Sequence, residues 1–280
     1  MSHNRRSLRI AITADLHYGI TRPDTIAALV NRIAENRCDL VLIAGDIGEP
    51  DGNFRRTLEL FTRLDFPRAL VAGNHDLWAK DYSSRYLWDD VLPDLTRRHG
   101  FRWLDGENLI LGEVGVCGTI GWYDYSAKDP RLSEYDNERY AKEKANFNYD
   151  AVKIDWPMAD QEFAALVLAG FRERIIRLEQ NTSVSQIIVL THVPPFPEQI
   201  IRKPENDFFW NVNNAYFGNL TLGREIERHH KVQLVISGHT HVAVDANHFC
   251  ADSSPRRAIR VITIGSQYYQ PHLQIIDLPV

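Results

Sequence analysis

The N-terminal part of the chain alternates short apolar runs with amphipathic stretches. Mainly apolar runs lie at 8–13, 40–44 and 69–71, and each run has the length of a buried strand. Between the first two runs, apolar residues recur at the spacing of one helix face: Ile26, Leu29, Val30 and Ile33. A second helix is predicted over residues 54–64. Strand and helix alternating in this way predict a parallel α/β layer.

The second half of the chain repeats this order. Buried strands are predicted at 186–190 and 232–236, closing strands at 258–263 and 273–276, and a helix over 163–178. Between the halves, a helix is predicted over 83–95 and short strands at 101–104, 108–111 and 114–117.

Residues 124–156 show neither helical nor strand periodicity and are rich in Tyr, Asp, Glu, Lys and Asn. A long unpatterned segment inside a compact domain is typical of a lid, an active-site loop or a disordered insert. We expect an insert at about 123–160 that acts as a lid or active-site loop. No repeat or linker divides the chain, so residues 1–280 are predicted to form a single domain.

Polar residues follow the predicted strands where ligands bind in open α/β sheets. The tetrapeptide Gly73-Asn74-His75-Asp76 follows the run at 69–71, with one alanine between them. The other strand ends carry similar residues: Asp15, His17, Asp46, His192, His239 and His241. A cap or turn role is the better interpretation for any one of them alone. As a set, they indicate one site, because buried imidazoles and carboxylates that converge are costly unless they are paired or bound to metal.

The donor types favour borderline divalent metals. Residues two apart in extended chain point to the same side, so the pairs Asp15/His17 and His239/His241 can each grip one ion. Carboxylate, imidazole and amide oxygen suit Mn²⁺, Fe²⁺/Fe³⁺ or Zn²⁺, and the absence of thiolates argues against a structural zinc site. The donors exceed what one ion needs, and two ions that share one carboxylate use them all.

In sequence order, the motifs D-x-H, G-D, G-N-H-D, a lone His and G-H-x-H resemble those of the calcineurin-like metallophosphoesterases. The resemblance extends from Asp15 to His241, with every motif intact. It implies a four-layer fold, in which a β-sandwich of two mixed sheets is flanked by helices. It also implies a hydrolase of phosphodiesters or phosphomonoesters that uses a hydroxide shared by two metal ions.

The same resemblance implies a role for each residue. One metal takes Asp15, His17 and His241; the other takes Asn74, His192 and His239. Asp46 bridges the two. His75 lies beside the scissile phosphate as the general acid, and Asp76 orients its ring.

Composition narrows the function. A formal net charge of −5 gives no global attraction to nucleic acid or anionic membranes, and no run of apolar residues is long enough to span a membrane. Cys38, Cys117 and Cys250 are odd in number and far apart, which indicates buried thiols in a reducing compartment, so we expect a cytoplasmic protein.

Three functional classes stay open. The favoured one is hydrolysis of a small phosphorylated substrate, with a nucleotide-like diester slightly preferred. A nuclease of the double-strand-break repair type shares these motifs, but the acidic balance counts against it. A non-catalytic binding module normally shows decayed ligands, and none is missing here.

The sequence predicts substrate recognition in less detail than it predicts the metal site. The Gly45-Asp46 motif lacks the following Arg that the related protein phosphatases use to hold phosphate. Aromatic residues at Trp78, 121–125 and 208–210 suit either stacking on a nucleobase or covering a hydrophobic loop. The sequence does not indicate the oligomeric state.

Overall fold

The first β-sheet contains the N-terminal strands. The computed structural model describes residues 7–49, 52–204, 207–251 and 257–280. Within them, this sheet consists of β1 (Ser7–Thr13), β2 (Leu40–Ala44), β3 (Arg68–Val71), β4 (Arg102–Trp103) and β11 (Gln274–Pro279). The order is β11-β1-β2-β3-β4. Strands β1 to β4 are parallel, and β11 pairs antiparallel to β1.

The second sheet is also mixed. Its strands are β5 (Leu109–Leu111), β6 (Val114–Thr119), β7 (Gln186–Thr191), β8 (Val232–Ser237), β9 (Val244–Phe249) and β10 (Ala258–Thr263). They lie in the order β5-β6-β7-β8-β10-β9. Strands β6, β7, β8 and β10 are parallel, and β5 and β9 are antiparallel edges.

The two sheets pack face to face around an aliphatic core. Side chains alternate across each strand, so Ile10 and Ile12 of β1 point between the sheets, while Ala11 points to the outer face. In the core they meet residues of the second sheet such as Ile188 and Leu190. Each fully buried side chain of this size contributes about 2 kcal/mol to stability. All residues of β2 are buried, as expected for a strand covered on both faces.

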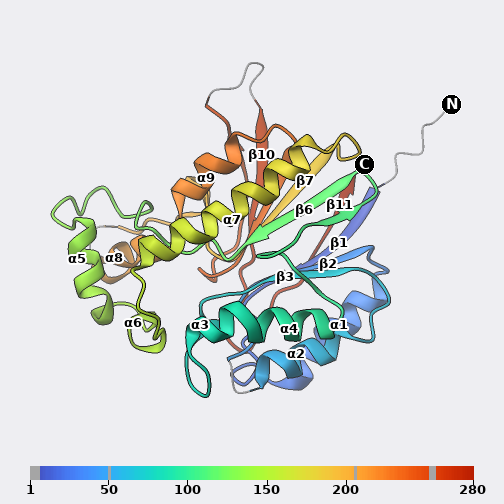
Figure 1. Cartoon of the computed structure of the whole chain (residues 1–280), viewed down its shortest axis with the longest axis horizontal. Helices are drawn as coiled ribbons and strands as arrows, with labels where there is room; N and C mark the ends of the chain where they lie inside the picture. The colour runs from blue at the N-terminus through green and yellow to red at the C-terminus, as the bar shows by residue number, and fades with distance from the viewer. Residues whose placement is uncertain (1–6, 50–51, 205–206, 252–256) are drawn as a thin grey trace.

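Helices cover the outer face of each sheet (Figure 1). On the first sheet lie α1 (Pro23–Glu35), α2 (Asn53–Phe61), α3 (Ser84–Tyr86), a π-helical turn (Leu87–Val91) and α4 (Leu92–Arg98). On the second lie α7 (Asp160–Gln180) and α9 (Leu220–Glu227). The apolar stripe predicted for the first helix is the buried face of α1. The four-layer α/β/β/α architecture is therefore confirmed.

Short helices gather at one end of the molecule, at the left of Figure 1. They are α5 (Asn137–Glu143), α6 (Asp150–Lys153) and α8 (Phe208–Phe217). The 3₁₀ turns in the described part of the chain are η1 (His75–Leu77), η3 (Lys144–Asn146) and η4 (Pro197–Gln199). Within the insert expected at about 123–160, α5 and α6 are too short to show a period in the sequence. Local caps such as Asp136, which accepts from the Arg139 N–H, hold them.

Two features that the composition bears on can be followed in the described residues. Cys38, Cys117 and Cys250 are buried and form no disulfide. Among these residues, every helix is either too short or too polar to cross a membrane.

Candidate metal centre

The ends of parallel strands bring the predicted ligands together. Strands β1, β2 and β3 lead directly into the loops that carry Asp15, Asp46 and Asn74. Strands β7 and β8 do the same for His192 and His239 in the second sheet. Because both sheets present this edge to the same side, the polar side chains form one cluster at the ends of the strands.

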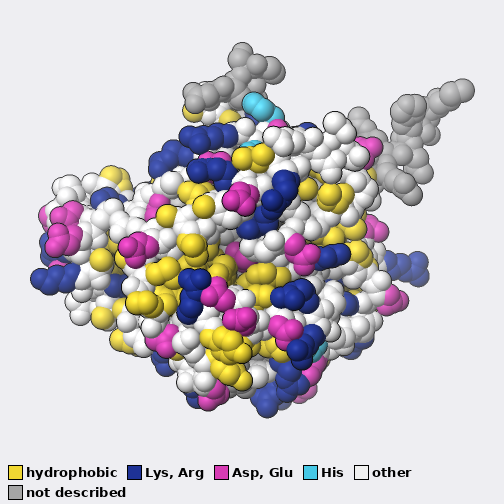
Figure 2. Space-filling model, in the orientation of Figure 1, with side chains coloured by type: hydrophobic (Ala, Val, Ile, Leu, Met, Phe, Trp, Pro, Cys, Tyr) yellow, Lys and Arg dark blue, Asp and Glu magenta, His cyan; other side chains and the backbone are white. Residues whose placement is uncertain are grey.

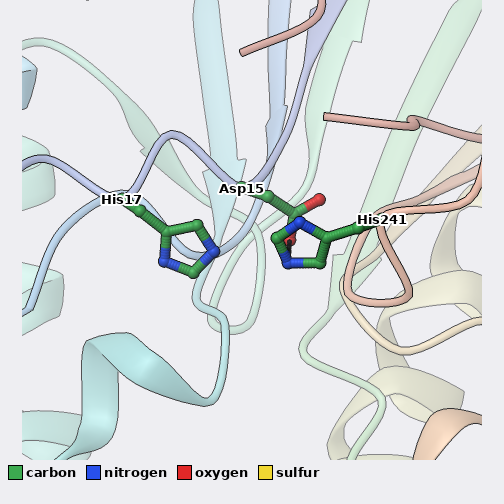
Figure 3. A group of neighbouring side chains, drawn as sticks. All are labelled: Asp15, His17 and His241. Atoms are coloured by element: carbon green, nitrogen blue, oxygen red, sulfur yellow. Dashed lines mark ion pairs between the residues drawn. The ribbon is translucent and has the colours of Figure 1, made fainter. Parts of the chain in front are cut away.

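Asp15, His17 and His241 form the first group of predicted ligands (Figure 3). One ligand atom from each lies within 4.8 Å of the others, and His241 Nε2 is 3.9 Å from Asp15 Oδ1. The rings of His17 and His241 lie nearly parallel, with centroids 5.3 Å apart. In this view the His241 ring overlaps the carboxylate of Asp15, and the His17 ring points toward both.

Asn74, His192 and His239 form the second group. Asn74 Oδ1 lies 2.9 Å from His192 Nε2 and 3.1 Å from His239 Nδ1. The two ring nitrogens are themselves 3.1 Å apart. This is the triad that the family resemblance implies for the second metal.

Asp46 lies between the two groups. Its Oδ2 is 3.6 Å from His17 Nε2, and its Oδ1 is 3.5 Å from His192 Nε2. Burial opposes its ionisation, but the histidines around it, among them the protonated His75, hold the pKa of Asp46 below its usual range. One carboxylate thus offers an oxygen to each group.

Hydrogen bonds on the far side of the second group fix its tautomers. His192 Nδ1–H donates to the Ala44 carbonyl at 2.8 Å, and His239 Nε2–H donates to the Tyr216 carbonyl at 2.9 Å. Both histidines therefore turn lone pairs toward the oxygen of Asn74. Three acceptors in contact are unfavourable without a cation between them, and this outer hydrogen bonding is typical of metal-binding histidines.

The first group contains buried polar atoms without a hydrogen-bond partner. They are Asp15 Oδ2, both ring nitrogens of His17, and His241 Nδ1. Burial lowers the pKa of His17 to about 3 and that of His192 to about 4, so these imidazoles are neutral and able to ligate. The residues therefore fit a pair of divalent cations.

The ligands lie in unusual backbone. Asp15, His17, Asp46, His239 and His241 all have φ between 43° and 71°, in the left-handed region. Asp and His tolerate this region better than most residues, but each such position still costs about 1 kcal/mol or more. Strain of this kind is a known feature of functional sites.

Two glycines allow the strand ends to approach one another. Gly45 has φ +82°, and a Cβ there would lie 2.4 Å from the ring of His192. A Cβ on Gly73 would lie 2.1 Å from Asp46 Oδ1. The glycine before Asp46 thus serves a turn, whereas the one before Asn74 makes room for the carboxylate of Asp46.

His75 faces the cluster from η1. Its Nε2 lies 4.0 Å from Asp46 Oδ2, and its Nδ1 lies 3.9 Å from Glu49 Oε1. Its ring stacks on Trp78 with centroids 3.8 Å apart. Burial opposes its protonation, yet the carboxylates of Asp46 and Glu49 raise the pKa of His75 to about 9. The imidazole can therefore hold a proton beside the metal ligands.

Asp76 does not contact the His75 ring that it was predicted to orient. Its Oδ1 accepts hydrogen bonds from the backbone N–H groups of Ile47 and Gly48, both at 2.9 Å. Its Oδ2 accepts from the Gly73 N–H at 2.8 Å. Both oxygens are thus used to join the loops after β2 and β3, and the carboxylate beside the His75 ring is that of Glu49.

A cavity of about 480 Å³ opens over the cluster. Besides ligands and His75, its lining includes residues that the motifs did not single out: Glu49, Phe147, Tyr149, Asp150, Phe209 and Tyr268. The Tyr268 ring lies 4.8 Å from those of both His17 and His241. Asp150 and Tyr149 come from the insert at about 123–160, which therefore borders the cavity.

Known structures share this fold. The phosphopantetheinyl hydrolase PptH from Mycobacterium tuberculosis is 18% identical, with a TM-score of 0.68, and 96% of each chain is covered. A dimetal phosphatase from Danio rerio is 12% identical, with a TM-score of 0.57, and the match covers 97% of this chain and 93% of the other. TT1561 of Thermus thermophilus is also 12% identical, with a TM-score of 0.56 and 97% and 99% coverage.

Sequence comparison gives the family. None of the proteins with curated descriptions matches the sequence significantly. The family model of the calcineurin-like phosphoesterases matches residues 8–243, a range that contains every ligand in the cluster. The chain therefore belongs to the calcineurin-like phosphoesterases and is a metal-dependent phosphoric ester hydrolase.

Proposed function

We propose that this enzyme hydrolyses one ester bond of a small phosphorylated substrate, and that a phosphodiester with a flat, uncharged leaving group is preferred. The observation that carries the proposal is the pair of ligand triads on either side of Asp46, at the floor of a cavity beside His75. Two divalent ions bound there would neutralise phosphate charge and lower the pKa of a water molecule into the neutral range.

The protein itself contributes a proton donor to the reaction. His75 presents Nε2 toward Asp46, and its protonated form is stabilised by Asp46 and Glu49. A protonated imidazole at this position can donate to the oxygen that leaves phosphorus, which makes the alcohol a better leaving group. Stacking on Trp78 fixes the orientation of the His75 ring. His75 is therefore the proposed general acid.

The cavity wall supports the choice of leaving group. Its lining includes the rings of Trp78, Phe147, Tyr149, Phe209 and Tyr268 and contains no Lys or Arg among the described residues. Aromatic faces suit stacking on a base or other flat group, and such stacking contributes about 1–3 kcal/mol per base. Without a cationic side chain, further phosphates on the substrate would gain nothing from the wall. A nucleoside-like diester meets these conditions better than a nucleoside polyphosphate.

A nuclease fits the surface less well. DNA-binding proteins present a continuous basic face to the phosphate backbone. On the face drawn in Figure 2, Lys and Arg side chains are interspersed with Asp and Glu. The whole chain carries a formal charge of −5.

A substrate panel tests the proposal. The Mn²⁺-loaded enzyme is assayed with bis-p-nitrophenyl phosphate, p-nitrophenyl phosphate, cyclic nucleotides, ATP, a phosphopantetheinyl conjugate and single-stranded DNA. The conjugate is included because a protein of the same fold is described as a phosphopantetheinyl hydrolase. We expect the highest kcat/KM for an aryl or nucleoside diester, and Asp46→Asn gives the background of contaminating phosphatases. No turnover of any compound by protein with two bound metals would identify a binding module instead.

A further inference from the structure

Asp150 lies far along the chain from every candidate ligand, yet its carboxylate contacts one of them. It begins α6 in the insert, and it is 1% exposed. Asn74 Nδ2 donates to both of its oxygens, at 3.0 Å to Oδ1 and 3.1 Å to Oδ2. The insert thus reaches the metal centre through one buried side chain.

This contact settles which end of the Asn74 amide faces the metal site. An amide rotated by half a turn would offer an NH₂ group, which cannot bind a cation. A carboxylate accepts hydrogen bonds and does not donate them, so rotation would press the Asn74 oxygen against the oxygens of Asp150. With Nδ2 held by Asp150, Oδ1 points to His192 and His239.

The same carboxylate also orders the environment of His75. Trp78 Nε1–H donates to Asp150 Oδ1 at 2.7 Å, and the Trp78 ring stacks on His75. Tyr123 OH donates to Oδ2 at 3.0 Å. Next to this network, the Ala79 N–H donates to the Lys153 carbonyl at 2.8 Å and joins α6 to the segment after η1. Asp150 therefore connects the insert to both a ligand and the proposed acid.

We propose that Asp150 is a positioning residue that orients the Asn74 amide for one of the two metal ions and, through Trp78, fixes the imidazole of His75. The inference rests on the proposed function only for the presence of the metal pair. Replacing groups that orient metal ligands in this way typically weakens metal binding about 10–100-fold.

Calorimetric titration of the apoenzyme with Mn²⁺ tests this role. Asn74→Ala and His17→Ala first assign the two binding steps to the two groups of ligands. We expect Asp150→Asn and Asp150→Ala to weaken the step assigned by Asn74→Ala about 10–100-fold and to leave the His17 step unchanged. A purely structural role would weaken both steps together. Asp150→Asn keeps the shape of the side chain and decides the matter if Asp150→Ala does not fold.

Asp160 offers a matched control. It is another buried carboxylate of this region. It accepts hydrogen bonds from the indole N–H of Trp122, the hydroxyl of Tyr125 and the ammonium group of Lys144, and none of these donors is a predicted ligand. Asp160→Asn is expected to lower the melting temperature and leave both binding steps unchanged. The inference is overturned if the Asp150 variants bind both ions as the wild type does, or if Asp160→Asn weakens the same step equally.

A crystal structure of the Mn²⁺-loaded wild type gives a second, independent measurement. We expect Asn74 Oδ1 on the metal and Nδ2 on Asp150, and a metal-bound Asn74 without Asp150 behind it would refute the role. Neither experiment measures turnover. An enzyme that hydrolyses none of the tested esters would contradict the proposed function and leave this inference standing.

Discussion

Glu49 Oε1 lies 3.9 Å from His75 Nδ1, whereas the other ring nitrogen, Nε2, faces Asp46. Glu49 follows Asp46 in the loop after β2, so a single loop supplies both the bridging carboxylate and the partner of the proposed acid. The side chain of Glu49 is 41% exposed, whereas that of Asp46 is 2% exposed. Solvent and substrate can therefore reach the carboxylate of Glu49, whereas that of Asp46 is buried.

Glu49→Gln should move the alkaline limb of the pH–rate profile to lower pH. In the folded protein, the pKa of His75 is raised to about 9, so the ring keeps its proton below that pH and loses it above. Loss of the Glu49 charge lowers this pKa by about one unit, since a nearby opposite charge is worth about that much or more. Bound cations lower it in wild type and variant alike. The measurement is kcat/KM against pH for both proteins.

Asp76→Asn is the control for that profile. It replaces an acceptor of three backbone N–H groups, so we expect the free energy of unfolding in urea to fall by about 1–3 kcal/mol. The alkaline limb should stay in place. A shift equal to that of Glu49→Gln would mean that Asp76 does act on the His75 ring.

His75→Ala should lower turnover roughly 10²–10⁴-fold, the usual contribution of an acid–base group. Metal content, measured by mass spectrometry of the purified protein, should stay near that of the wild type. The test is needed because ligand atoms of His17, Asp46 and His75 also lie within 4.8 Å of one another. Stoichiometric loss of one ion from the variant would make His75 a ligand.

Removal of metal should abolish activity and destabilise the fold. The buried acceptors of Asp15, His17 and His241 then have no partner. At a concentration one hundred times its dissociation constant, a ligand stabilises the folded state by about 2.7 kcal/mol. We therefore expect Mn²⁺ to raise the melting temperature of the chelator-treated protein by about 5 °C or more. Asp46→Asn should show a much smaller rise, and an equal rise would place the ions elsewhere.

Gly73→Ala should eliminate metal binding although it changes no ligand. The added Cβ would lie 2.1 Å from Asp46 Oδ1 and 2.3 Å from its backbone N, so the bridging carboxylate must move. Gly112→Ala is a suitable control, because at φ +57° it strains the backbone but meets no atom within 4 Å. It should lose about 1 kcal/mol of stability and keep both ions. Normal metal content in Gly73→Ala would contradict the assigned position of Asp46.

The sequence predicted what depends on local pattern. The strand ends at Asp15, Asp46 and Asn74 follow runs whose apolar character marks them as buried strands, and the structure brings them to one edge. The family resemblance supplied the two mixed sheets. The strand β9 was missed because its exposure alternates at a sheet edge without a strong apolar face.

Long-range contacts had no signal in the sequence. Asp150 is 76 residues from Asn74, inside a segment without a period, and an aspartate there reads as a solvated loop residue. Helix α8 was missed because its asparagines, including the buried Asn213 and Asn214, have low helix propensity. Its first turn contains Phe208–Trp210, a stretch for which the sequence left open stacking on a base and covering a loop. Packing decides such elements, and packing is a property of the whole chain.

The left-handed backbone at Asp15, His17, Asp46, His239 and His241 has a consequence for how the protein tolerates change. Glycine adopts these angles freely. Replacing one of these residues by glycine would therefore relieve backbone strain while it removes a metal ligand. An inactive relative of this chain would thus regain part of the stability that it gives up on losing its ions. At these positions, selection for stability of the fold and selection for hydrolytic activity act in opposite directions.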